Sequence, residues 1–332
     1  MKAGVIGLGV GADHAAAYAD HPQAELSLLC DLNDARLREV GGKHPGARLT
    51  TSADDVLNDP ELEIVSVASY DSDHHAQVVG ALSAGKHVFV EKPLCQTPNQ
   101  AREIHELLAR RPELVLSSNL LLRASPRFRL LKGWLDQGRF GRVYYLEGDY
   151  DYGRLWKITE GWRGQLETYS VTLGGTVHVL DLLLWLTGER AVRVQAAGNQ
   201  LVTEGTKFRF DDLVVALVEL ESGAIAKLGA NFGCVHPHFH ELKVFGTKAT
   251  FVNGLEEATL WTDPGDGPVA ERIDAAYPGV RKGDLIASFI DAAAGGPPPL
   301  VTAGEVFHVM ATCFAIDSAA AREKPVAVEA FD

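Results

Sequence analysis

The chain has 332 residues, of which 46% are hydrophobic and 23% charged, and its formal net charge is −13. The composition is that of an ordinary globular protein, and the length allows two domains. The negative charge excludes nucleic acid and anionic membranes as expected partners, because both require a basic surface.

The first third of the chain alternates short apolar segments with helical ones. We expect strands at residues 3–9, 25–31, 64–69, 87–93 and 113–119. Between them we expect helices at 12–21, 33–43, 73–85 and 100–111. This alternation is typical of a parallel sheet with helices on both faces, so residues 1–118 are predicted to form an α/β domain.

From about residue 119 the pattern changes to longer strand-like runs joined by turns. The runs cover 142–153, 191–201, 213–232, 240–252 and 258–263. A strongly apolar helix is expected within 175–188, and two more at 283–294 and 303–322. Residues 119–332 are therefore predicted to be an α+β domain built on a large, mostly antiparallel open sheet.

A glycine-rich turn follows the first strand. Gly7, Gly9 and Ala12 form G-x-G-x-x-A between a strand and a helix, which is typical of dinucleotide binding in a Rossmann domain. The first glycine makes the turn, the second lets the backbone approach a pyrophosphate, and the helix N-terminus receives its charge. Asp31 ends the second strand and can bind a ribose diol. It favours NAD over NADP, although Arg36 lies only five residues further on.

Polar side chains also follow the later strands of this domain. Ligands of open α/β sheets bind outside the carboxyl ends of the strands. We therefore expect a group of five residues to extend the cofactor site, namely Ser69, His74, Glu91, Lys92 and Asn119.

Several segments resemble the glucose-fructose oxidoreductase / inositol dehydrogenase / rhizopine catabolism family. They are residues 4–14, 71–93, 174–188 and 241–250, and the G-K-H-V-x-x-E-K-P segment at 85–93 is the most specific. The resemblance spans nearly the whole chain and implies an NAD-dependent oxidoreductase. One departure is Ser69-Tyr70, where the family often has Thr-Pro.

The resemblance implies a catalytic role for Lys92. In the family, the lysine of E-K-P lies between the nicotinamide and the oxidised sugar hydroxyl, and its bond to proline is often cis. We expect Lys92 to bind the substrate oxygen and move its proton, and the Lys92–Pro93 bond to be cis. A partly desolvated lysine beside a cationic nicotinamide has its pKa lowered, which suits that role.

The apolar helix of the second domain carries His178, Asp181 and Trp185 on one face. Because the family places a catalytic histidine and a sugar-contacting aspartate at this H-x-x-D, His178 is expected to be catalytic and Asp181 to bind substrate. The structural alternative is a core histidine with an internally bonded aspartate.

Other polar residues are weaker candidates for binding a sugar. Tyr152 and Arg163 lie in a segment rich in Tyr, Trp and Arg at 149–164, and Arg123 lies near the predicted domain junction. His236, His238 and His240 alternate as if along one strand face, which is a possible zinc arrangement. No cysteine or carboxylate motif accompanies them, so no metal is expected.

The sequence thus predicts oxidation or reduction of a secondary alcohol of a sugar, cyclitol or sugar nucleotide, with Lys92 and His178 moving the proton. Two alternatives stay open: a glycosidase of the same fold that recycles its NAD, and a sensor that binds sugar and dinucleotide without turnover.

Three further expectations concern the surroundings of the site. Gly174 stands four residues before His178, where many family members have an aspartate, so vacated volume and free helix N–H groups are expected to admit a decorated sugar. Apolar residues on both faces of 214–220 predict a homodimer or homotetramer. The four separated cysteines, the glycine-interrupted N-terminus and the absence of any run near ~18 apolar residues predict a cytoplasmic protein.

Overall fold

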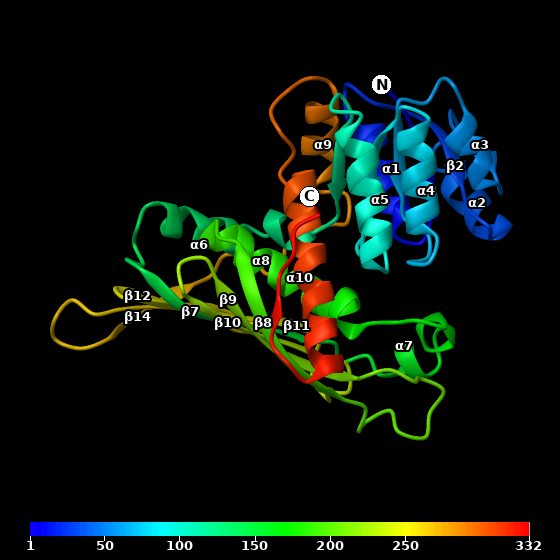
Figure 1. The fold of residues 1–332 in the computed structure, drawn as a ribbon. Coiled ribbons are helices and arrows are strands. Elements are labelled where there is room, and N and C mark those ends of the chain that lie inside the picture. The colour runs from blue at the N-terminus through cyan, green and yellow to red at the C-terminus, as the bar shows by residue number, and fades with distance from the viewer. Residues whose placement is uncertain (332) are drawn as a thin grey trace. The chain divides into compact units, whose positions relative to one another are not determined.

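The computed structural model describes residues 1–331, and their contacts divide the chain into two compact units (Figure 1). Unit 1 comprises Met1–Leu121, Val280–Phe307 and Phe331, and unit 2 comprises Leu122–Gly279 and His308–Ala330. The division falls within helix α10 (Ala303–Arg322). Among the described residues, no helix has the length and apolarity needed to cross a bilayer.

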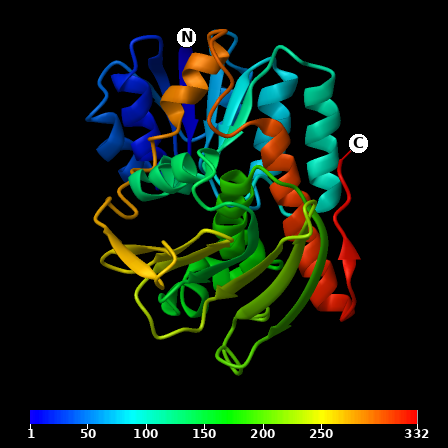
Figure 2. The same ribbon diagram turned by 90° about the vertical axis from the view of Figure 1, so that its left-hand side faces the viewer.

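Unit 1 contains a six-stranded parallel sheet in the order β3-β2-β1-β4-β5-β6, which confirms the predicted Rossmann architecture. The strands are β1 (Lys2–Ile6), β2 (Glu25–Cys30), β3 (Arg48–Thr50), β4 (Ile64–Val67), β5 (His87–Val90) and β6 (Leu116–Ser118). Its helices are α1 (Gly11–Asp20), α2 (Asp34–Gly41), α3 (Ala53–Asn58), α4 (His74–Ser83), α5 (Pro98–Ala109) and α9 (Ile286–Ala293). Figure 2 shows helices on both sides of this sheet.

The central strands of this sheet are mostly apolar and buried because helices cover both faces. Every residue of β4 is buried, and Phe89 of β5 packs on Phe289 of α9, with ring centroids 5.5 Å apart. Strand β3 and helix α3 were not predicted from the sequence. Strand β3 has only three residues, and none of them is buried, so it leaves no apolar pattern. Helix α9 also packs against α1, so a segment near the C-terminus completes the first unit.

Unit 2 contains a nine-stranded sheet in the order β14-β13-β12-β11-β7-β10-β9-β8-β15. The strands are β7 (Val143–Asp151), β8 (Ala191–Asn199), β9 (Leu213–Leu220), β10 (Ile225–Asn231), β11 (Phe239–Gly246), β12 (Ala249–Asn253), β13 (Ala258–Thr262), β14 (Val269–Ile273) and β15 (Val326–Ala327). Only β7 and β10 pair in parallel among these neighbours, so the predicted mostly antiparallel sheet is confirmed. The helices before and beside it are η1 (Leu121–Ala124), α6 (Pro126–Asp136), α7 (Trp156–Thr159), η2 (Trp162–Gln165), the π-helix η3 (Thr172–Thr176) and α8 (Val177–Thr187).

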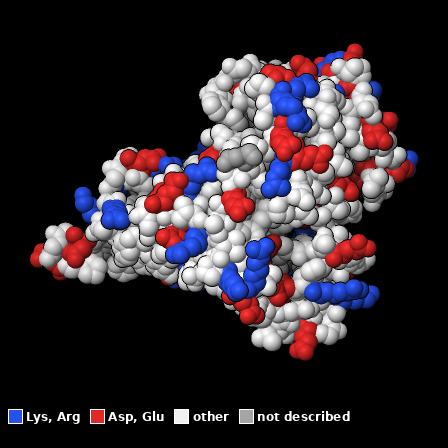
Figure 3. Space-filling model, viewed as in Figure 1, with Lys and Arg blue, Asp and Glu red and all other residues white. Residues whose placement is uncertain are grey.

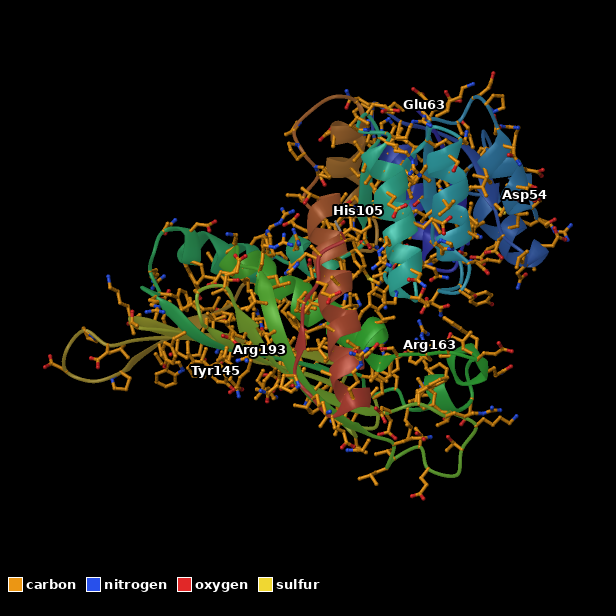
Figure 4. All side chains as sticks on the ribbon, viewed as in Figure 1. Asp54, Glu63, His105, Tyr145, Arg163 and Arg193 are labelled. Atoms are coloured by element: carbon orange, nitrogen blue, oxygen red, sulfur yellow. The ribbon has the colours of Figure 1, made fainter. Side chains whose placement is uncertain are left out.

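The two faces of the large sheet differ sharply. Helix α8 lies on the inner face, where a Cβ at Gly148 would come within 3.2 Å of Val179. On the outer face, alternate residues stay exposed, and the large apolar ones are Val215 (37%), Leu217 (48%), Ile225 (37%) and Trp261 (40%). Tyr145, labelled in Figure 4, belongs to the same face through its pairing with Ile225. In the view of Figure 3, charges of both signs are interspersed over the surface.

Candidate active site

The glycine-rich turn of unit 1 has the geometry that its motif predicts. Gly7 has φ +85°, and a Cβ there would lie 2.4 Å from the carbonyl oxygen of Ala68, so only glycine fits. A Cβ at Gly9 would meet nothing within 4 Å, so the backbone is open to close approach on that side. The small residue that packs α1 on β1 is Gly11, whose Cβ would lie 3.0 Å from Val5, while Ala12 is half-buried beside it.

Asp31 follows β2 and holds the turn in place. Its Oδ2 accepts the N–H of Leu8 at 2.6 Å and its Oδ1 accepts the N–H of Asn33 at 2.7 Å. Arg36 lies against the same turn, donating from Nε to the carbonyl of Leu8 at 2.8 Å. Its guanidinium is also paired with Glu39, which supplies the opposite charge.

Lys92 lies just beyond the carboxyl end of β5, which stops at Val90. The Lys92–Pro93 bond is cis, as predicted, and the Lys92 side chain is partly buried. The Glu91 N–H donates to the carbonyl of Val67 at 2.8 Å, which extends the β4–β5 pairing to the residue before the lysine. Lys92 therefore lies at the same sheet edge as the glycine turn and Asp31.

A buried polar network lies behind this turn. The Asn119 amide donates to Glu91 Oε1 at 2.6 Å and to the carbonyl of Lys282 at 2.9 Å. His14 Nε2 lies 3.4 Å from the same Glu91 oxygen, and its Nδ1 lies 2.9 Å from the Ser66 hydroxyl. Burial by itself would raise the pKa of Glu91, but the His14 and Asn119 hydrogen bonds and the Lys282 charge together lower this pKa to about 2. Glu91 is therefore a buried carboxylate.

His74 and Ser69, also predicted near the cofactor, bond protein groups. His74 is fully buried in the first turn of α4, and its Nδ1 donates to the Pro93 carbonyl at 2.7 Å. The Ser69 hydroxyl lies 2.7 Å from Oε1 of Gln77, to which it donates. Asn119, His74 and Glu91 are exposed by 0%, 0% and 7%, so these side chains support the turn from inside unit 1.

In unit 2, Asp181 has a partner within the protein. Arg123 donates from Nε to both oxygens of Asp181 at 3.0 and 3.2 Å, and from Nη2 to Oδ1 at 2.6 Å. The two side chains are exposed by only 2% and 1%. Within the protein, the partner of the buried Asp181 is therefore a guanidinium. A contact of this kind is what the structural alternative, an internally bonded aspartate, predicts.

His178 lies one turn before Asp181 on α8, as the helical spacing predicts. Its ring is 6% exposed and stacks on Tyr150 of β7, with centroids 5.7 Å apart and an interplanar angle of 15°. His240 of β11 contacts it edge-on at 5.8 Å. Tyr150 and His240 are opposite each other on the inner face of the sheet, so strand pairing brings them to the helix.

Sequence reasoning missed two residues of this cluster, Tyr150 and Tyr277. The Tyr277 hydroxyl accepts the backbone N–H of His240 at 2.9 Å and lies 2.7 Å from its Nδ1. Burial raises the pKa of Tyr277 well above its ordinary value. Tyr150 could have been found from the alternation of Leu146, Gly148 and Tyr150 along β7, which places it on the buried face. Tyr277 lies in an irregular segment and offers no such pattern.

Tyr152 and Arg163 occupy the segment that the sequence marked as sugar-binding. Tyr152 is 5% exposed and packs on Phe232 with ring centroids 4.3 Å apart. Arg163, labelled in Figure 4, lies in the short helix η2 over the ring of Trp162 at 4.3 Å.

The prediction that three histidines alternate along one strand was wrong. Strand β11 begins at Phe239, so His236 and His238 precede it in an irregular turn, and only His240 is on the strand. His236 is exposed and lies 3.7 Å from Asp151. Within residues 1–331, no group of three or more His, Cys, Asp or Glu side chains is arranged to hold a metal ion.

The expected vacated volume at Gly174 is filled. A Cβ at this position would lie 2.3 Å from the hydroxyl oxygen of Tyr169 and 3.3 Å from Phe232. The expected helix N-terminus is also not at this position, because η3 runs directly into α8. The Gly174 N–H donates to the Ser170 carbonyl at 2.9 Å. The argument for a decorated sugar from this position is therefore wrong.

The fold and the turn define a dinucleotide-binding protein of the Rossmann class. The model of the oxidoreductase family with an NAD-binding Rossmann fold matches residues 1–119, and that of the GFO/IDH/MocA C-terminal domain matches residues 128–252. The chain belongs to the Gfo/Idh/MocA oxidoreductase family.

Relatives with known names fall in the same class. The chain is 27% identical over 272 residues to myo-inositol 2-dehydrogenase of Thermotoga maritima, covering 78% of this chain and 77% of the relative. It is 32% identical over 232 residues to UDP-N-acetylglucosamine 3-dehydrogenase of Acidithiobacillus ferrooxidans, covering 70% and 67%. The solved structure of levoglucosan dehydrogenase with NADH has the same fold, with a TM-score of 0.87 at 21% identity over 99% of both chains.

The residues of unit 1 fit a bound NAD. Gly9 leaves the backbone open beside the N-terminus of α1, where a pyrophosphate would be held by N–H groups and the helix dipole. Asp31 at the end of β2 is placed for the ribose hydroxyls, as in other dinucleotide-binding sheets. The match of residues 1–119 to the family with an NAD-binding Rossmann fold confirms NAD as the predicted cofactor.

Proposed function

We propose that the protein is an NAD-dependent dehydrogenase that oxidises or reduces a secondary alcohol of a sugar, cyclitol or sugar nucleotide. One observation carries the proposal: Lys92 lies in a Glu-Lys-cis-Pro turn at the carboxyl edge of the parallel sheet, the edge that also holds the glycine turn and Asp31. A lysine there can bind a substrate hydroxyl beside the cofactor. The names of the relatives support substrates of this class.

NAD, when bound, supplies the hydride acceptor, and the remaining chemistry belongs to side chains. The Lys92 amino group is proposed to bind the reacting hydroxyl oxygen and to take its proton as the hydride leaves carbon. His178 is proposed as the second proton-transfer group. Its support is the family resemblance at H-x-x-D and its place on an ordered helix, stacked on Tyr150.

Two residues are proposed to contact the sugar, and two to support the site. The aromatic ring of Tyr152 suits the face of a sugar ring, and the guanidinium of Arg163 can donate two hydrogen bonds to sugar hydroxyls. Arg123 and Asp181 are proposed to support α8, because their buried ion pair lies one helical turn from His178. The pair would then hold His178 at a constant orientation.

The test is a panel assay with NAD and the substrates of the relatives: myo-inositol, D-xylose, levoglucosan and UDP-N-acetylglucosamine. Net formation of NADH supports the dehydrogenase. Release of the aglycone from an aryl glycoside without net NADH would replace it with the NAD-recycling glycosidase. Binding of sugar and NADH with neither reaction would replace it with the sensor.

We also propose that the outer face of the nine-stranded sheet pairs with a second copy of the chain. Its exposed apolar residues lie beside two ion pairs, Lys243–Glu147 and Lys227–Asp149. A second copy of the chain can complement such a face, which is apolar but carries charges of both signs. Leu217→Glu should convert a dimer or tetramer to monomers in sedimentation velocity at micromolar concentration. Leu201→Glu, on an exposed loop, is the control. A monomeric wild-type protein would contradict the proposal.

A further inference from the structure

Two histidines of unit 1 are completely buried and reach the residues on either side of Lys92. His14 comes from α1 and His74 from α4, and both are 0% exposed. Neither ring faces solvent, so neither is placed to contact a ligand that binds from outside. Both rings instead bond the turn that carries the lysine.

On the C-terminal side of the lysine, His74 holds the backbone. Its Nδ1 is 2.7 Å from the Pro93 carbonyl oxygen, and a carbonyl can only accept, so Nδ1 carries the proton. This bond ties the cis turn to the first turn of α4. The turn thus has a fixed point one residue after Lys92.

On the N-terminal side, His14 holds the Glu91 carboxylate. Both hydrogens of the Asn119 amide are used, one on Glu91 Oε1 and one on the Lys282 carbonyl. His14 Nε2 also lies 3.3 Å from this amide nitrogen, which has no hydrogen left to give it. We therefore assign His14 Nε2 as a donor to Glu91 and its Nδ1 as an acceptor from the Ser66 hydroxyl. Glu91 is fixed from two directions, and its own N–H continues the strand pairing to Val67.

We propose that His14 and His74 are positioning residues for Lys92: His14 acts through the side chain of Glu91 before it, and His74 through the backbone carbonyl of Pro93 after it. The inference rests on the proposed function of Lys92 as the group that binds the reacting hydroxyl. A lysine side chain has four rotatable bonds, so its amino group can be placed within about 0.5 Å only if its backbone is held firmly. Two buried imidazoles, each fixed on a helix, supply that hold.

The two histidines use different nitrogens, and this permits a rescue test. Asparagine places an amide N–H near the position of Nδ1, and glutamine places one near Nε2. His74→Ala should lower kcat by ~10-fold or more on the best substrate of the panel, with His74→Asn restoring most of it and His74→Gln little. For His14 the order should reverse, because Gln can donate to Glu91 from the position of Nε2.

The NADH dissociation constant, measured by fluorescence titration, should change by less than ~2-fold in these variants, because neither ring is placed to touch the cofactor. His75→Ala is the matched control, since His75 is the neighbour of His74 on α4 but pairs with Glu103 at the surface. A loss shared equally by the Ala, Asn and Gln variants would overturn the proposal as a general packing effect. So would a loss seen only in NADH affinity.

A second readout needs no substrate. Reductive methylation with ¹³C-formaldehyde labels Lys92, and Lys92→Arg identifies its resonance in the NMR spectrum. The resonance should shift or broaden in His14→Ala and His74→Ala, and return in His14→Gln and His74→Asn. An unchanged resonance in both alanine variants would overturn the positioning role. If no sugar is oxidised but the resonance responds as expected, the proposed function fails while the positioning holds.

Discussion

Arg123 and Asp181 form an ion pair in the interior of unit 2, with three N–H to oxygen contacts between 2.6 and 3.2 Å. Removing either partner leaves a buried charge without its opposite. We expect Asp181→Leu to lower the free energy of unfolding by about 3–5 kcal/mol, and Arg123→Met by a similar amount. Urea unfolding measures both.

The double variant Arg123→Met/Asp181→Leu should lose far less than the sum of the two, because no uncompensated charge remains. The control is Glu113→Gln, which breaks the exposed pair with Arg111 and should cost less than about 1 kcal/mol. If Asp181→Leu leaves stability unchanged and only raises KM, Asp181 binds substrate instead.

Gly174 is a packing position. Because a Cβ there would lie 2.3 Å from the Tyr169 hydroxyl oxygen, Gly174→Ala should lower the free energy of unfolding by about 1–3 kcal/mol. In a Tyr169→Phe background the same change should cost less, since the clashing oxygen is gone. A double-mutant cycle in urea gives the coupling between the two positions.

Gly133 provides the matched control for this helical glycine. It lies within α6, and a Cβ there would meet nothing within 4 Å. Gly133→Ala should be neutral or stabilising by up to about 1 kcal/mol. Equal effects of alanine at 133 and 174 would contradict the packing account of Gly174.

Asp31 is expected to make the protein prefer NADH over NADPH, because a 2′-phosphate would meet its carboxylate. Asp31→Ser with Leu32→Arg should shift the ratio of dissociation constants towards NADPH by ~10-fold or more. Since Asp31 also accepts the Leu8 N–H, Asp31→Asn serves to separate charge from turn support. Tighter binding of NADPH than of NADH by the unaltered protein would contradict the assignment.

Glu91 should make stability depend on pH in the acid range. Its pKa falls from 4.5 to about 2 on folding, so the carboxylate stabilises the folded state above pH 4.5. That contribution is lost as pH falls towards 2. Glu91→Gln should therefore destabilise by roughly 3 kcal/mol at neutral pH and by less than half of that near pH 3. If the difference in unfolding free energy between the wild type and Glu91→Gln stays constant from pH 7 to pH 3, the stabilising role of the Glu91 carboxylate is contradicted.

Much of unit 1 was predictable because parallel strands bring their carboxyl ends to one edge. Once segments 3–9, 25–31 and 87–93 were assigned as strands, Gly7, Asp31 and Lys92 had to share that edge. The roles of the neighbouring polar residues were not predictable. Whether His74 faces a ligand or the Pro93 carbonyl depends on the rotation of α4, which no periodicity specifies.

The features that the sequence did not predict depend on contacts between distant segments of the chain. Arg123 and Asp181 are 58 residues apart, and the Lys282 carbonyl meets Asn119 across 163 residues, so neither pairing leaves a local pattern. At Gly174 the sequence records the missing side chain but not that Tyr169 fills the space. The alternation of His236, His238 and His240 was real, but the strand begins only at Phe239.

The central claim is that Lys92 moves the proton of a sugar or cyclitol hydroxyl during hydride transfer to NAD. The most direct measurement is the rate of NADH formation with the best substrate of the panel, for the wild type, Lys92→Ala and His178→Ala, together with each NADH dissociation constant. Both variants should lose ~10²-fold or more in kcat with NADH affinity nearly unchanged. Full turnover in Lys92→Ala would contradict the account.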